Sequence, residues 1–100
     1  MTNWPDKDPA ETITVTFDFS ALAETLVSAT VETSVARGLP DPAPAAILSG
    51  SPSVQGALVM QRIAAGQAGT TYALRCLAND ADGEVHVLVA ALPIATARPR

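Results

Sequence analysis

Cysteine and histidine are residue types that commonly act together in catalysis, and the chain has one of each: Cys76 and His86. A cysteine becomes a nucleophile when a histidine within hydrogen-bond reach takes its proton and a third group orients that histidine. The alternation of the sequence places the two residues on neighbouring strands of a hairpin, with their side chains on opposite faces. We therefore expect a buried structural cysteine and an exposed histidine. No serine lies in a nucleophile-elbow motif either, so the sequence predicts a protein that is not an enzyme.

Carboxylates and glycines offer two further kinds of site. Asp80, Asp82 and Glu84 carry the oxygen ligands that calcium prefers, but the segment lacks the length and spacing of a dedicated calcium loop. Gly66 and Gly69 are followed neither by a helix signal nor by a Lys-Ser/Thr pair, so they predict a turn and not a phosphate cradle. We expect no metal and no cofactor.

The composition fits one domain with an apolar core. The chain has 100 residues, 48% of them hydrophobic. Ten acidic residues against six scattered basic ones give a net charge of −4, which disfavours nucleic-acid binding. A single cysteine cannot form an internal disulfide. The first residues do not read as a signal peptide, and the apolar stretch 85–95 is too short to span a bilayer. We therefore expect synthesis in the cytoplasm and no membrane attachment.

The first half of the chain predicts two strands. Apolar residues alternate with polar ones from 13 to 19, with Ile13, Val15, Phe17 and Phe19 pointing inward. Residues 20–25 predict one helical turn capped by Ser20, with Leu22 turned inward. A second strand follows over 26–37, with inward positions at Leu26, Ala29, Val31, Thr33 and Val35. Its alternation slips near Ser28, which predicts a bulge.

The second half predicts a loop, further strands and a final hairpin. Three prolines make 38–46 a loop. Residues 46–48 predict a short edge strand, and 53–65 a strand bent at Gly56, with a helix over 57–65 as the open alternative. The turn signals at 79–83 join a strand starting near Tyr72 to the last strand. In that last strand we expect Val85, Val87 and Val89 inward and Glu84, His86 and Leu88 outward.

This succession of short strands predicts an all-β, immunoglobulin-like β-sandwich of about six to eight strands. Tyr72 lies where many such sandwiches carry a corner tyrosine, whose hydroxyl bonds to a nearby backbone group. We expect an extended arm over residues 1–10, the sandwich over 11–95 and a tail over 96–100.

Several segments, taken in order and spacing, resemble small structural proteins of tailed bacteriophages. They are Lys7-Asp8-Pro9, Asp18-Phe19-Ser20, Thr25-Leu26-Val27-Ser28 and the Gly66-to-Tyr72 segment with Gly69-Thr70 at its centre. The chain departs from that family at Ala65-Gly66, where a Gly-Gly is usual, and over 79–84, where Thr-Ser-x-Gly-Arg is usual. The resemblance implies a virion structural component with an immunoglobulin-like fold, in some cases a fiber–tail adaptor.

Together these features predict a non-enzymatic adaptor or decoration module of a phage virion, in the tail or neck or as a capsid cement. Its partners would be capsid, neck, tail or fiber subunits, with the chain itself a homo-oligomer or present in many copies. The candidate contact residues are Trp4, Pro5 and Pro9 in the arm and Pro40, Pro42 and Pro44 in the loop. A ligand- or carbohydrate-binding sandwich module is the alternative, which the scarcity of aromatic residues disfavours.

Overall fold

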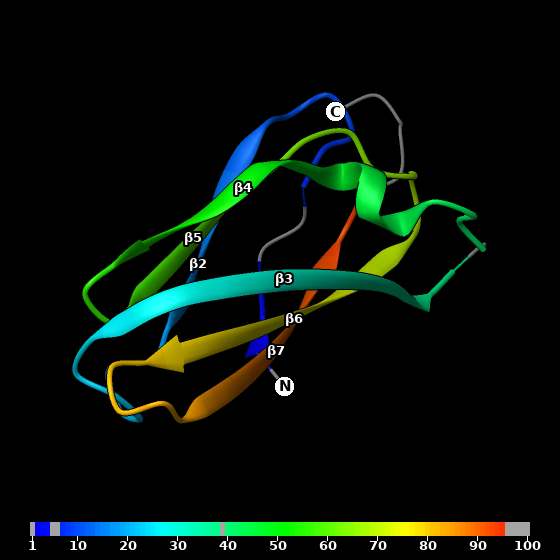
Figure 1. Cartoon of the computed structure of the whole chain (residues 1–100). Helices are drawn as coiled ribbons and strands as arrows, with labels where there is room; N and C mark the ends of the chain where they lie inside the picture. The colour runs from blue at the N-terminus through cyan, green and yellow to red at the C-terminus, as the bar shows by residue number, and fades with distance from the viewer. Residues whose placement is uncertain (1, 5–6, 39, 96–100) are drawn as a thin grey trace.

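The part of the chain that the structure describes, residues 2–4, 7–38 and 40–95 of a computed structural model, forms seven strands in two sheets (Figure 1). One sheet has the order β1-β7-β6-β3, from β1 (Thr2–Asn3), β3 (Leu26–Arg37), β6 (Thr71–Asp80) and β7 (Val85–Pro93). The other has the order β2-β5-β4, from β2 (Ile13–Asp18), β4 (Leu48–Gln55) and β5 (Leu58–Ile63). A short 3₁₀ helix, η1 (Pro44–Ile47), precedes β4. The predicted all-β class is confirmed.

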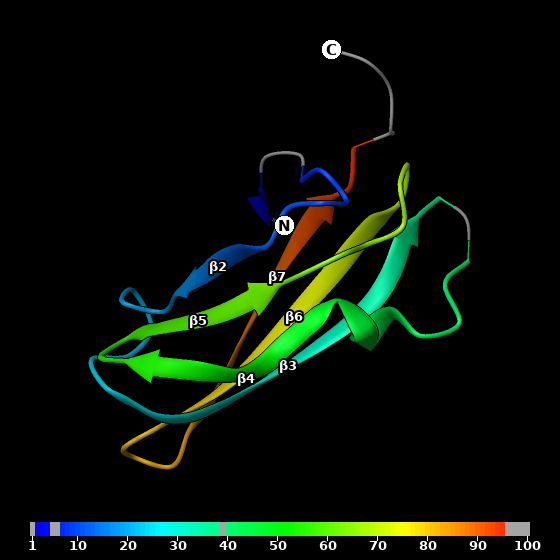
Figure 2. The ribbon, with the colours of Figure 1, turned by 90° about the horizontal axis from the view of Figure 1, so that it is seen from above.

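The sheets lie one above the other, as Figure 2 shows from above. All pairings within them are antiparallel except that of β1 with β7, which is parallel, with Thr2 opposite Ala90 and Asn3 opposite Ala91. Lys7 forms a further parallel bridge to Ile94. The described part of the predicted N-terminal arm therefore lies against the last strand of the domain.

The core forms where the inward faces of the two sheets meet. Val15, Phe17 and Phe19 are buried as the alternation of β2 predicts. In β3 the register shifts between Leu26 and Ser28, which confirms the predicted bulge. Burial of each large apolar side chain contributes about 1.5–3 kcal/mol. The core is completed chiefly by Leu26, Ile47, Val59, Ile63, Tyr72, Leu74, Cys76, Leu92 and Ile94.

Of the helical turn predicted for residues 20–25, one turn forms, closed by the bond from the Ala23 N–H to the Phe19 carbonyl, but no helix extends over 20–25 and the predicted cap and inward residue are wrong. The Asp18 carboxylate accepts a hydrogen bond from the Ser20 N–H at 2.9 Å, so Ser20 does not cap a helix. The Phe19 carbonyl accepts bonds from both Leu22 and Ala23, which closes a tight turn. This turn leaves Leu22 51% exposed, whereas the sequence predicted it inward.

The middle of the chain also differs from the prediction. Residues 44–47 are 3₁₀ helix, so of the short edge strand predicted for 46–48 only Leu48 is strand; it begins the longer edge strand β4, which runs on through residues 49–55. The single strand predicted for 53–65 is a hairpin of two, and the alternative helix over 57–65 is wrong. Gly56 has φ of 60°, a value that suits glycine and lets Gly56 and Ala57 form a two-residue turn between paired Gln55 and Leu58.

The faces of β7 are the reverse of those predicted. In the hairpin the inward residues Cys76 and Ala78 pair with Leu88 and His86, so these two point between the sheets. Val85, Val87 and Val89 consequently lie on the outer face, 57%, 38% and 38% exposed. Both faces of this strand are apolar, so its alternation is ambiguous, and the length of the turn before it decides which set is buried.

Candidate contact surfaces

Trp4, the one large apolar residue of the N-terminal segment, bridges the two sheets. Its ring meets that of Phe17 edge-on, with centroids 5.1 Å apart and planes at 75°, a favourable aromatic geometry. The backbone N–H of Trp4 donates a hydrogen bond to the carbonyl of Ala91 on β7 at 2.9 Å. Trp4 therefore packs, half-buried, on the open side of the sandwich between β2 and β7.

Lys7 anchors the same segment. Its side chain is almost fully buried, at 1% exposure. The ammonium donates to the carbonyl of Ala65 at 2.6 Å and to that of Asp8 at 2.9 Å. Burial lowers the pKa of Lys7, while the carboxylates of Glu11 and Asp8 act in the opposite direction. Bonds between Lys7 and the backbone of Pro93 and Ala95 complete the attachment.

The sequence did not reveal Lys7 because lysine is almost always exposed. Its position in the Lys7-Asp8-Pro9 motif was the available signal. Within that motif Asp8 orders the next turn, since its carboxylate accepts from the N–H of Ala10 and its own N–H donates to Glu11. Pro9 is half-buried in this turn. Pro5, also a candidate contact, lies outside the described residues.

The proline-rich loop 38–46 is tied to the core through Tyr72. The Tyr72 hydroxyl donates to Asp41 Oδ2 at 2.7 Å and accepts from the backbone N–H of Gln67 at 3.0 Å. The second bond confirms the predicted corner-tyrosine contact with nearby backbone. The first lowers the pKa of Asp41, which also accepts from the Ala43 N–H, and burial raises the pKa of Tyr72.

We call the end of the sandwich that carries loops 8–12, 38–47 and 64–70 the proline end. Of the candidate contact residues there, Pro40 and Pro42 are exposed, and Pro44 is half-buried where η1 begins. The loops are linked to each other as well as to the core, since Lys7 bonds to the 64–70 loop and Gly38 lies directly against the backbone of that loop. Prolines on a loop held in place lose little conformational entropy on binding, so Pro40 and Pro42 remain candidate contact residues.

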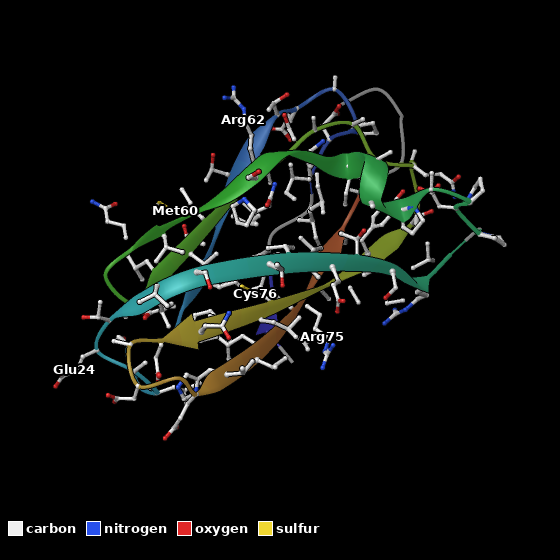
Figure 3. All side chains as sticks on the ribbon, viewed as in Figure 1. Glu24, Met60, Arg62, Arg75 and Cys76 are labelled. Carbon is white, nitrogen blue, oxygen red and sulfur yellow. The ribbon has the colours of Figure 1, made fainter. Side chains whose placement is uncertain are left out.

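The opposite end, which we call the acidic end, carries the turns at 19–25, 56–57 and 80–84. A cavity of about 560 Å³ lies between the first and last of these turns. Its charged lining residues are all acidic. They are Glu24, Asp80, Asp82 and Glu84. Figure 3 shows one of them, Glu24, at this end of the molecule. This end therefore presents negative charge without a compensating base in the cavity lining.

Asp80 organises the acidic end. Its Oδ1 accepts from the N–H groups of Asp82 and Glu84, and its Oδ2 lies 2.9 Å from His86 Nε2. The bond to His86, followed by that to Glu84, lowers the pKa of Asp80. Atoms of Asp80, Glu84 and His86 lie within 4.8 Å of one another. Both Asp80 oxygens are already engaged, so this cluster orders the predicted turn.

Cys76 and His86 do not form a catalytic pair. Both side chains point between the sheets, so the predicted placement on opposite faces is wrong, as is the exposed position predicted for His86. The His86 ring bonds to Asp80, and burial raises the pKa of the Cys76 thiol to about 11. A thiol of that pKa is a poor nucleophile at neutral pH. Figure 3 shows Cys76 between the sheets, with Arg62 and Arg75 on the outer faces.

An apolar groove runs along the open side of the sandwich between β2 and β7. One part of it, about 230 Å³, is lined by Trp4, Phe17 and Leu88, with Asp18 as its one charged residue. The exposed valines of β7 lie beside it, on the outer face of the sheet. We did not predict this surface from the sequence, because the alternation of the last strand was interpreted with its valines in the core.

A family model described as Podophage GP4 fiber-tail adaptor protein gp77 matches residues 7–93. No curated protein and no solved structure matches the chain. Within the described residues, none of the helical segments has the length and apolar character needed to cross a membrane.

Proposed function

The chain belongs to the family of podophage fiber–tail adaptor proteins, and we propose that it joins fiber to tail subunits in the virion through protein contacts alone, without catalysis. The family implies a virion component that binds other virion proteins. The match over residues 7–93 is the observation that carries the proposal, because it includes nearly the whole folded domain.

Two chemically different ends support an adaptor role. The proline end displays Pro40 and Pro42 on a loop held by Tyr72, whereas the acidic end presents the carboxylates around Asp80. A protein that joins two others needs separate surfaces of this kind. We assign contacts with neighbouring subunits to Trp4, Pro5, Pro9, Pro40, Pro42 and Pro44, and propose that the chain is present in many copies, so that individually weak contacts add.

We further propose that the fold is immunoglobulin-like. In that fold one sheet holds the second, fifth and fourth strands in the order B-E-D, and the other holds C, F and G. With β2 as strand B, the orders β2-β5-β4 and β7-β6-β3 match this arrangement. The hydroxyl contact of Tyr72 near the start of β6 fits a tyrosine corner on strand F.

The competing carbohydrate-binding function has no support in the aromatic residues. Carbohydrate recognition would need exposed rings on one loop end, but Phe17, Phe19 and Tyr72 are buried and Trp4 packs on Phe17. The non-enzymatic assignment is supported by the burial of the Cys76 thiol, which raises its pKa to about 11.

The proposal is tested by deleting the gene from the phage that encodes this chain. We expect particles that keep capsid and tail but lack fibers in electron micrographs, and a complementing wild-type copy should restore the fibers. Particles with a full set of fibers in the absence of the chain would contradict the adaptor role.

A second experiment tests the proline end. Replacing the two exposed prolines, Pro40→Ala with Pro42→Ala, should leave the fold intact and reduce fiber attachment. Ser53→Ala, an exposed change on β4, is the matched control that should attach fibers normally. Normal attachment in both variants would remove the proline loop from the contact surface.

A further inference from the structure

The first half of β7 has a backbone edge that no described residue pairs with. The Trp4 N–H donates to the carbonyl of Ala91, so the backbone groups of Ala91 point toward the β1 side. The direction of these groups alternates along a strand. The N–H and C=O groups of Val85, Val87 and Val89 therefore point to the same side. The parallel pairing of Thr2 with Ala90 uses the carbonyl of Val89, so the groups that β1 leaves open are those of Val85 and Val87 and the N–H of Val89.

This edge lacks the features that natural sheets use to prevent strand addition, which are lysine, proline, bulges and inward-pointing charges. The segment 85–89 contains no proline, and its one ionisable residue, His86, is engaged by Asp80. By contrast, the β4 edge contains Gly50, Pro52 and a register shift, and the β3 edge carries Glu32 and Arg37 with shifts near both of its ends. The β7 edge is therefore well suited to pair with another strand.

Side chains of an added strand would find apolar surface on both faces. Residues pointing inward would enter the groove of about 230 Å³ lined by Trp4, Phe17 and Leu88. Residues pointing outward would cover the exposed side chains of Val85 and Val87. Successive residues of a strand point to opposite faces, so an occupant with consecutive aliphatic residues would fill the groove on one face and cover the valines on the other. Its backbone would at the same time pair with the open groups of β7.

The length and charge of the occupant are also constrained. The pairing of β1 begins with Thr2 on the carbonyl of Val89 and the acidic turn ends at Glu84, so the added strand pairs with the segment from Val85 to the N–H of Val89. Asp18 lines the groove and the carboxylates of the acidic end lie beyond Glu84. These charges favour a Lys or Arg at the end of the added strand that lies nearest Glu84.

We infer that the Val85–Val89 edge of β7 binds an extended apolar segment, with a basic residue at one end, from a neighbouring fiber or tail subunit by β-strand addition. The inference rests on the proposed adaptor function and identifies the surface that performs it. β1 already occupies the other half of the same edge by the same type of pairing, so the added strand continues an existing sheet.

Val87→Pro tests the backbone pairing directly. The Val87 N–H points away from β6, so proline removes the donor that the added strand needs without breaking the β6–β7 ladder. Val87→Thr keeps the N–H and the β-branched shape and is the matched control. We expect at least a tenfold lower content of the Val87→Pro chain in purified particles by mass spectrometry, with the threonine variant incorporated as the wild type.

Val87→Lys covers the case in which proline prevents folding, as judged by circular dichroism, because an edge lysine blocks pairing without altering the backbone. Hydrogen exchange gives an independent readout: amides of Val85, Val87 and Val89 should exchange at least tenfold more slowly in particles than in the free chain. Normal incorporation of all variants, or unchanged exchange, overturns this inference alone. Particles that lack the wild-type chain overturn the adaptor function as well.

Discussion

The hydroxyl of Tyr72 provides a quantitative test of how the proline end is held. Tyr72→Phe removes one oxygen atom and keeps the fully buried ring. The lost interactions are the bond donated to the Asp41 carboxylate at 2.7 Å and the bond accepted from Gln67 N–H at 3.0 Å. Hydrogen bonds contribute about 0.5–1.5 kcal/mol when neutral and about 1.5–3 kcal/mol when one partner is charged.

We expect Tyr72→Phe to lower the free energy of unfolding by about 2 kcal/mol, near the bottom of the summed range, because water can reach the exposed loop and replace part of the loss. In a domain of this size that corresponds to a fall in Tm of about 10 °C. Urea unfolding followed by circular dichroism at pH 7 measures the difference, and the slope of the transition should not change.

Asp41→Ala supplies the control background. This variant already lacks the acceptor of the Tyr72 hydroxyl, so adding Tyr72→Phe should lower the stability by no more than half as much as it does in the wild type. An equal effect of Tyr72→Phe in both backgrounds would refute the assignment of the Tyr72–Asp41 bond as the link between loop and core.

Three further measurements test the other contacts described above. Lys7→Met keeps the apolar stem but removes the donor to Ala65, so urea unfolding should show a loss of about 1–3 kcal/mol; an unchanged midpoint would contradict the anchoring role. The Cys76 thiol, with a pKa near 11, should react with a thiol reagent at pH 8 at least 100-fold more slowly in the folded chain than in urea, and equal rates would show that it is accessible. The pKa of Asp80 is lowered in the folded state, so the stabilisation it provides is complete above its ordinary value of about 4 and is lost as the pH falls through the folded pKa. Urea midpoints between pH 7 and pH 2.5 should show this loss, and Asp80→Asn should reduce it; an unreduced loss in that variant would assign it to other groups.

The sequence was informative where only one face of a strand is apolar. The strand with Val15 and Phe17 alternates with threonines, so its inward face was predictable, and the turn at 79–83 was predictable from its Asn, Asp and Gly residues. β7 carries valines on one face and Leu88 with Leu92 on the other. Hydrophobicity alone does not distinguish these faces, and the pairing with β6 decides between them.

The contact surfaces were harder to predict than the strands, because they depend on residues distant in the sequence. The bonds of Lys7 to Ala65 and of Tyr72 to Asp41 span 58 and 31 residues. Local pattern contains no information about such partners. The prolines of loop 38–46 were correctly placed in a loop, but the bond that fixes this loop to the core depends on the fold as a whole.

The parallel pairing of β1 with β7 also determines how the domain bears mechanical load. β1 and β7 run in the same direction, so a pull between Thr2 and Ala95 slides the two strands lengthwise past each other. The bonds that Trp4 and Lys7 form with this strand are then strained together, in shear, and none can open before the others as in a zipper. Resistance to such a pull is set by the unfolding rate, and shear loading keeps this rate low, as the proposed position of the chain between fiber and tail would require.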